Sequence, residues 1–124
     1  MNQFLMIAAG GALGAVSRYG MSSGVYSLLG RSFPYGTLVV NVIGSLLMGF
    51  LYVLLVERMN VSAEFRALLL IGFLGSFTTF STFSMETLSL IQQAEMLKAA
   101  LNMFISLFVC LLATWLGLIV ARIL

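Results

Sequence analysis

Long apolar stretches alternate with short polar links along the chain, and this pattern predicts four membrane-spanning helices. A helix needs about 20 mostly apolar residues to cross a bilayer. Four stretches reach this length, at residues 4–29, 37–56, 67–91 and 99–121. The links between them are RSFPYG, ERMNVSAEFR and QQAEMLK. We therefore expect an all-α integral membrane protein in which residues 1–124 form a single four-helix membrane domain.

Composition agrees with this expectation and narrows the classes of function. Of the 124 residues, 61% are hydrophobic and 8% are charged, whereas soluble domains are about half apolar and a quarter charged. The basic residues are scattered singly, which disfavours a nucleic-acid surface. His and Asp are absent and Cys110 is the single cysteine, so a zinc cluster or a disulfide within the chain lacks ligands. No nucleophile, base and orienting group fall together, so an enzyme is not expected.

The charges in the links are nearly balanced between the two sides of the membrane. Four spans place both termini on one side together with Arg58, Arg66 and Arg122, and leave Arg31 and Lys98 on the other. The positive-inside rule depends on a difference between the sides, so this distribution predicts that chains insert in both orientations. The alternative is that another feature fixes the orientation. Because four helices can hardly enclose a polar path, we also expect an oligomer.

Small residues at a spacing of four indicate close contacts between helices, because they let two backbones approach. The pairs with this spacing are Gly10 with Gly14, Gly20 with Gly24, and Ser45 with Gly49. Such pairs are common in membrane helices, so they indicate contacts and no particular function.

Three polar side chains inside the spans are costly to keep in a membrane. Arg18 lies in the first span, where a guanidinium costs roughly 2.5 to 3.5 kcal/mol. It therefore faces protein partners or a wet cavity, such as a vestibule that attracts anions, or it snorkels to the interface. Asn41 lies near the start of the second span, and its amide donors either join helices or meet a permeating anion. Glu86 in the third span would repel anions if ionised or donate a hydrogen bond if protonated, and the alternative is that it pairs with a base at a helix end.

The segment GFLGSFTTFSTF at residues 72–83 predicts a break in the third helix. Each glycine lowers the helix propensity by about 1 kcal/mol, and the Ser and Thr side chains compete for backbone hydrogen bonds. We expect the break near residues 75–79. A break inside a membrane frees backbone carbonyls, which is tolerated where they line a cavity or bind an ion.

If the helix resumes near Phe80, then Phe80 and Phe83 lie on one face and Ser81 and Ser84 form a neighbouring row of hydroxyl groups. An aromatic ring has a positive edge, so two rings beside hydroxyl groups suit an anion path. The alternative is that these phenylalanines only pack against other apolar groups, and the spacing by itself favours packing.

Three sequence motifs closely resemble the Fluc, or CrcB-type, fluoride channel family. They are GGALGAVSRYG at residues 10–20, GTLVVNVIGS at residues 36–45, and GFLGS followed by TTFSTFS in the third span. The match covers all four spans in order. The resemblance implies an antiparallel, dual-topology homodimer with two fluoride pores and a central structural sodium ion held by backbone carbonyls at the helix break.

The resemblance also implies roles for individual residues. Those that it assigns to the fluoride pathway are Asn41, Phe80, Ser81, Thr82, Phe83, Ser84 and Glu86. It implies that the rings of Phe80 and Phe83 contact fluoride, and that the carbonyls of Gly75 and Thr78 face sodium. Arg18 matches an arginine in the first helix of the family and is a candidate for a vestibule.

The expected function is passive export of cytoplasmic fluoride through the plasma (inner) membrane, which the chain would cross several times. Hydrogen fluoride crosses lipid and dissociates inside the cell, so a pore for the anion lets the accumulated fluoride leave the cytoplasm. Two other classes stay open: a small dual-topology multidrug or cation antiporter, and a noncatalytic membrane subunit. The antiporter needs a central membrane carboxylate, whereas the first span contains Arg18. Neither alternative accounts for the phenylalanine and hydroxyl segment.

Overall fold

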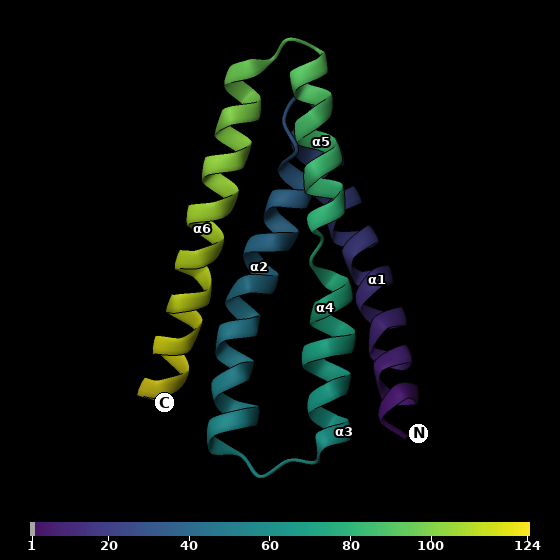
Figure 1. Ribbon diagram of the computed structural model, residues 1–124, viewed down its shortest axis with the longest axis vertical. Helices are drawn as coiled ribbons and strands as arrows, with labels where there is room; N and C mark the ends of the chain where they lie inside the picture. The colour runs from purple at the N-terminus through teal and green to yellow at the C-terminus, as the bar shows by residue number, and fades with distance from the viewer. Residues whose placement is uncertain (1) are drawn as a thin grey trace.

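The computed structural model describes residues 2–124 and is helical throughout, with no strand in that range (Figure 1). The first helix is α1 (Asn2–Leu29). The second is α2 (Tyr35–Tyr52), which continues into the π-helical segment η1 (Val53–Arg58). The third comprises α3 (Ala63–Arg66), the π-helical segment η2 (Ala67–Phe73), α4 (Leu74–Phe77) and α5 (Phe80–Gln92). The fourth is α6 (Met96–Ile123).

All four helices are long and apolar enough to cross a bilayer, as the hydrophobic pattern predicts. The third begins at Ala63, earlier than the apolar pattern indicates, because the Ser62 side chain accepts a hydrogen bond from the Phe65 N–H at 3.1 Å and caps the first turn. The first helix ends at Leu29 and is followed by Gly30, whose φ of +83° is the left-handed conformation that follows many helices. The polar residues just before the third apolar stretch, residues 63–66, therefore belong to the helix.

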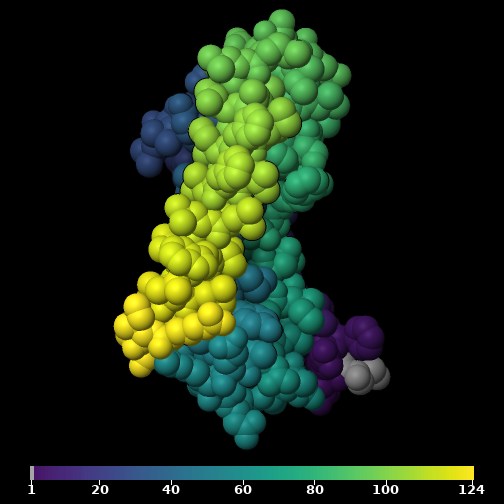
Figure 2. All heavy atoms as spheres, turned by 60° about the vertical axis from the view of Figure 1, so that its left-hand side comes forward, coloured from purple at the N-terminus to yellow at the C-terminus, as the bar shows by residue number. Residues whose placement is uncertain are grey.

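The links alternate between the two ends of the molecule. Figure 1 shows both termini at the same end as the link between η1 and α3, and the link between α5 and α6 at the opposite end. The space-filling view shows α6 lying along the outside of the molecule over its whole length (Figure 2). Most of its exposed side chains are large and apolar, among them Phe104, Phe108 and Trp115, as expected of a helix that faces lipid or another protein.

Glycines bring α1 against η2 at backbone distance. A Cβ atom on Gly10 would meet the Leu68 carbonyl oxygen, and one on Gly14 would meet the Phe73 carbonyl oxygen. The pair Gly10 and Gly14 thus forms the close contact that its spacing predicts. The pair Gly20 and Gly24 does not, because no atom of the described residues lies within 4 Å of a Cβ atom built on either.

A second close contact joins α2 and α6 in a reciprocal way. A Cβ atom on Gly49 would meet the Thr114 carbonyl oxygen, and one on Gly117 would meet the Leu46 carbonyl oxygen. Each helix therefore places a glycine against the backbone of the other. The first span thus packs closely against the third, and the second against the fourth. The break in the third helix lies within this packed arrangement.

Candidate functional site

The third helix breaks at two residues, between α4 and α5. Thr78 has φ −84° and ψ 154°, and Thr79 has φ −147° and ψ 121°, so both are extended. The break that the sequence predicts is therefore present and the helix resumes at Phe80, but Gly75 lies inside α4 and outside the extended part. Hydroxyl-bearing residues, and not the glycine, interrupt the helix, because their side chains replace the helical hydrogen bonds.

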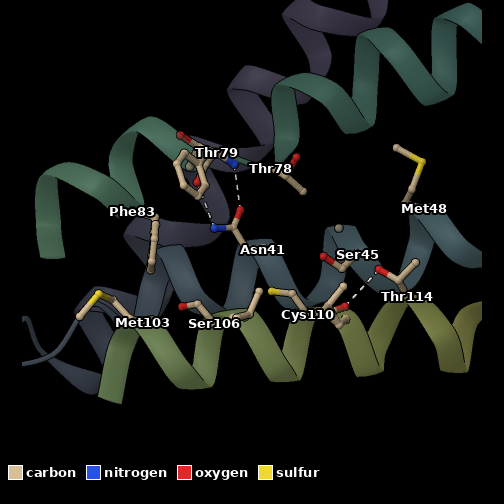
Figure 3. A pocket seen from close by; sticks show the side chains of 14 residues that line it. Asn41, Ser45, Met48, Thr78, Thr79, Phe83, Met103, Ser106, Cys110 and Thr114 are labelled. Carbon is tan, nitrogen blue, oxygen red and sulfur yellow. Dashed lines mark hydrogen bonds between the residues drawn. The ribbon is translucent and has the colours of Figure 1, made fainter. Parts of the chain in front are cut away.

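Asn41 satisfies both backbone groups of Thr79. The Thr79 N–H donates to Asn41 Oδ1 at 2.8 Å, and Asn41 Nδ2 donates to the Thr79 carbonyl oxygen at 3.0 Å (Figure 3). Asn41 therefore joins two helices, which is one of the two fates that the sequence allows. An amide nitrogen has two hydrogens, so one N–H of Asn41 is left to meet a further acceptor.

Arg18 satisfies another group at the break. Its Nε donates to the Ser76 carbonyl oxygen at 3.0 Å, across 58 residues of sequence. In an unbroken helix this carbonyl would accept from the N–H of Phe80, which is the first residue of α5. The guanidinium of the first span thus caps the end of α4, which is a protein partner of the kind that the sequence allows for Arg18.

Two carbonyls at the break lose their helical partners. In an unbroken helix the Gly75 and Thr78 carbonyls would accept from the N–H groups of Thr79 and Thr82. The Thr79 N–H donates to Asn41 Oδ1, and the Thr82 N–H donates to Thr79 Oγ1 at 3.2 Å. Gly75 is also exposed in the single chain. These carbonyls form the oxygen set that the resemblance assigns to sodium.

A groove of about 590 Å³ lies between α2, the break and α6 (Figure 3). The rings of Phe80 and Phe83 line it with centroids 5.4 Å apart, and Asn41 lies beside them. Phe80 is 78% exposed. The remaining lining residues are Gly44, Ser45, Met48, Thr78, Thr79, Met103, Ser106, Leu107, Cys110, Leu111 and Thr114. The structure therefore brings together the two rings and the amide that the sequence selects.

Besides Thr78 and Thr79 at the break, the hydroxyl groups of the groove come from α2 and α6, where the sequence motifs do not predict them. Ser106, Cys110 and Thr114 follow one another at a spacing of four along α6, and Ser45 lies four residues after Asn41 on α2. This spacing places each row on one helix face. The spacing of these residues can be read from the sequence, but the apolar composition of the fourth span draws attention away from it.

The three hydroxyl residues predicted on α5 do not line this groove. The Ser84 hydroxyl donates to the Phe80 carbonyl oxygen at 3.0 Å, and the Thr82 hydroxyl accepts from Thr79 Oγ1 at 3.1 Å. Ser81 is exposed and lies 3.4 Å from Thr79 Oγ1. In the single chain these hydroxyl groups lie within hydrogen-bond distance of other groups in the first turn of α5.

Glu86 lies in a second cavity, of about 360 Å³, at the end of the molecule that holds residues 30–34. The Tyr26 hydroxyl donates to Glu86 Oε2 at 2.6 Å. No hydrogen-bond partner for the buried Oε1 atom is present among residues 2–124. One sequence-based alternative pairs Glu86 with a base at a helix end. In the structure its partner is the phenol of Tyr26 instead.

A buried polar cluster between α5 and α6 was also missed. Asn102, which is 2% exposed, donates through Nδ2 to Thr87 Oγ1 at 2.8 Å and accepts from the Ser106 hydroxyl at 3.3 Å. The Thr87 hydroxyl donates to the Phe83 carbonyl oxygen at 2.8 Å. Hydrogen bonds thus link one groove hydroxyl to the backbone of one groove ring. The signal in the sequence is a lone asparagine in an apolar span.

These features define a class: a four-helix membrane protein with a broken third helix and a groove lined by aromatic rings, an amide and hydroxyl groups. In the described residues no cluster of three or more His, Cys, Asp or Glu side chains accompanies the groove. The family model described as "CrcB-like protein, Camphor Resistance (CrcB)" matches residues 5–118. The chain belongs to this CrcB family.

Curated relatives support the same assignment. The chain is 52% identical over 120 residues to the fluoride-specific ion channel FluC of Magnetococcus marinus, covering 97% of this chain and 98% of the relative. It is 53% identical over 117 residues to FluC of Shewanella amazonensis, covering 94% of each. Against FluC of Methylococcus capsulatus the identity is 55% over 116 residues, which cover 94% of this chain and about half (51%) of the longer relative.

Proposed function

We propose that the chain is a fluoride-specific ion channel that crosses the plasma membrane several times and carries fluoride passively out of the cytoplasm. The observation that supports this most directly is the groove in which Phe80, Phe83 and Asn41 meet. Relatives named as fluoride-specific channels are similar to the chain over almost all of its length. The groove crosses the zone where the third helix is broken, so its lining combines apolar walls with a few fixed polar groups.

The lining suits a small, strongly hydrated anion. Fluoride must exchange its waters for other donors to enter a narrow path. The free N–H of Asn41 and the hydroxyl group of Ser45 are such donors, whereas the Thr114 hydroxyl donates to the Cys110 carbonyl oxygen at 3.0 Å. The tilted rings of Phe80 and Phe83 offer positive edges without a formal charge that would hold the anion. Chloride is larger and less in need of such donors, so a narrow path of this kind favours fluoride.

The test is ion efflux from liposomes that contain the purified protein. Fluoride and chloride are loaded at the same concentration, and the release of each is followed with an ion-selective electrode. We expect rapid fluoride release with chloride release close to that of protein-free vesicles. Equal release of both anions, or of neither, would remove the proposed function.

We further propose that the working channel is an antiparallel homodimer with two fluoride pores. Two observations support a partner: the Phe80 ring, which lines the groove, is 78% exposed, and Gly75 at the break is exposed. A second copy would cover both and close the groove. The nearly balanced charges at the two ends permit insertion in either orientation.

Orientation is tested with single cysteines placed in the 30–34 link of a Cys110→Ser background. A membrane-impermeant thiol reagent should label part of the population from each side. Labelling from one side only would remove the dual-topology proposal while leaving the channel proposal in place.

A structural sodium ion is the last part of the proposal. The carbonyls of Gly75 and Thr78 fit such an ion, because their helical N–H partners are engaged elsewhere, and unwound backbone carbonyls coordinate sodium in other membrane proteins. The ion would neutralise the carbonyl dipoles where two chains meet. Stability measured in sodium and in a large organic cation should differ, with sodium raising the melting temperature of the dimer. Equal melting temperatures would contradict a sodium site.

A further inference from the structure

The second cavity, at the end of the molecule that holds residues 30–34, is lined by charged side chains of both signs. They are Arg31, Glu86, Glu95 and Lys98. The cavity adjoins the groove along α5, because Phe83 lines the groove and Glu86, about one helical turn further on, lines the cavity. An anion that uses this end of the groove therefore passes close to these charged groups.

Arg31 differs from the other cation of the cavity because it has no acidic partner. Lys98 Nζ lies 3.9 Å from Glu95 Oε2. The other ion pair among residues 2–124 joins Arg122 to Glu57, at the opposite end of the molecule (Figure 1). Arg31 is exposed on the 30–34 link. Its charge is therefore not offset by a neighbouring carboxylate.

The ring of Tyr26 holds the Arg31 guanidinium in place. The guanidinium carbon lies 4.4 Å from the ring centroid, which is a favourable cation–π position. The ring is itself fixed, because a Cβ atom on Gly36 would meet its Cε2 atom and because its hydroxyl lies 3.3 Å from Thr37 Oγ1. A carboxylate partner would cancel the charge, whereas an aromatic face positions a guanidinium and leaves its charge intact.

We propose that Arg31 is an anion-recruiting residue: its charge, positioned by the Tyr26 ring, raises the local concentration of fluoride at this end of the path. The role rests on the proposed fluoride channel and adds a capture step before the groove. A fixed charge attracts any small anion, so Arg31 increases the rate of capture and leaves selection between anions to the groove. Lys98 contributes less, because Glu95 lies beside it.

The test is the initial rate of fluoride release from liposomes of a neutral lipid, phosphatidylcholine, that contain the wild type, Arg31→Gln or Arg31→Lys. At an ionic strength of about 10 mM, Arg31→Gln should lower the rate about two- to fivefold, the factor for one unit charge about 4–8 Å away in water. At about 1 M, set with the salt of a large organic anion, the rates should be equal, because the Debye length falls from about 30 to about 3 Å. Arg31→Lys keeps the charge and should retain the wild-type rate.

Arg58→Gln is the matched control, because Arg58 is exposed at the opposite end of the chain and lines neither cavity. It changes the net charge equally and should leave the rate unchanged. A loss in Arg31→Gln that is the same at both ionic strengths would indicate a structural role and overturn the inference. So would a wild-type rate at low ionic strength, or an equal loss in Arg58→Gln. Wild-type vesicles that release no fluoride would instead overturn the proposed function, so the two failures are distinguishable.

Discussion

Asn41 on α2 and Thr79 in the broken third helix exchange two hydrogen bonds, at 2.8 and 3.0 Å. Both backbone groups of Thr79 are thereby satisfied by one side chain, which a break inside a membrane requires. Because Phe80 follows directly, the same two bonds fix the start of α5 and the place of its rings relative to α2. One amide thus determines both the stability of the break and the geometry of the groove.

Replacing Asn41 should separate these two effects. Asn41→Leu leaves the Thr79 N–H and carbonyl without partners, and each unpaired group costs about 1–3 kcal/mol, so the melting temperature in detergent should fall clearly. Asn41→Asp keeps an acceptor for the N–H and should destabilise less, yet its charge in the groove should abolish fluoride flux. Asn60→Leu, in an exposed link, is the control. Equal melting temperatures for the two leucine variants would contradict this account of the break.

The rings carry the second prediction. Phe80→Ile or Phe83→Ile keeps an apolar side chain but removes the positive ring edge, so fluoride flux should fall steeply. Size-exclusion profiles should be unchanged. The methionine variants should retain part of the flux, because a polarizable thioether partly replaces the ring.

Phe104→Ile provides the matched control for the rings, since Phe104 lies on α6 outside the groove and is 60% exposed. If the rings only pack, assembly will instead decline in step with side-chain volume, and flux per assembled protein will stay near the wild-type value in the Phe80→Ile, Phe83→Ile protein.

Arg18 provides a third prediction, on stability. Arg18→Met removes the donor to the Ser76 carbonyl, and hydrogen bonds to charged groups are worth about 1.5–3 kcal/mol. Unfolding in detergent, followed by thermal denaturation, should show a loss of this size. Arg122→Met is the comparison, because its pair with Glu57 at 3.3 Å is exposed and such pairs contribute at most about 1 kcal/mol. A smaller loss for Arg18→Met than for Arg122→Met would refute the capping role.

The glycines make a fourth prediction with its control on the same chain. Gly49→Ala places a methyl group against the Thr114 carbonyl oxygen, so α2 and α6 must separate and the yield of folded protein should drop sharply. Gly24→Ala meets no described atom within 4 Å, and in a helix interior this change contributes about 1 kcal/mol in favour of folding. Fluorescence-detected size exclusion of the two variants decides the matter, and a similar loss for both would contradict the packing.

Cys110 allows a direct test of whether the groove holds water. It is half-buried and lines the groove, and it is the single cysteine of the chain. A small methanethiosulfonate reagent should modify it and block fluoride flux, and fluoride present during the reaction should slow the modification. Cys110→Ser should conduct and resist the reagent. A wild-type channel that conducts fluoride while Cys110 stays unreactive would place the pathway elsewhere.

The features that the sequence predicts correctly are local ones. The apolar lengths give four helices, and Thr78 and Thr79 interrupt the third because hydroxyl side chains compete for backbone bonds within a few residues. Phe80 and Phe83 share a face because helical spacing alone determines it.

The partners of these residues could not be predicted in the same way. Arg18 meets Ser76 across 58 residues, and Tyr26 meets Glu86 across 60, so both pairs depend on how α1 packs against the third helix. The glycine contacts set that packing, and the spacing of Gly10 and Gly14 does not identify their partner. For the same reason the sequence predicts that Ser81 and Ser84 line a path together with the rings, whereas the hydroxyl groups in the groove are those of Thr78 and Thr79 at the break and of residues on α2 and α6.

The close contacts at Gly10 and Gly14 join the first span to the third, and those at Gly49 and Gly117 join the second to the fourth. A ribosome delivers the spans in numerical order, so neither contact can form while only the first two spans are in the membrane. The third span completes the contact at Gly10 and Gly14, and α2 keeps Gly49 open to lipid until α6 has been synthesised. The contact between the second and fourth spans therefore forms only after the last quarter of the chain has been synthesised.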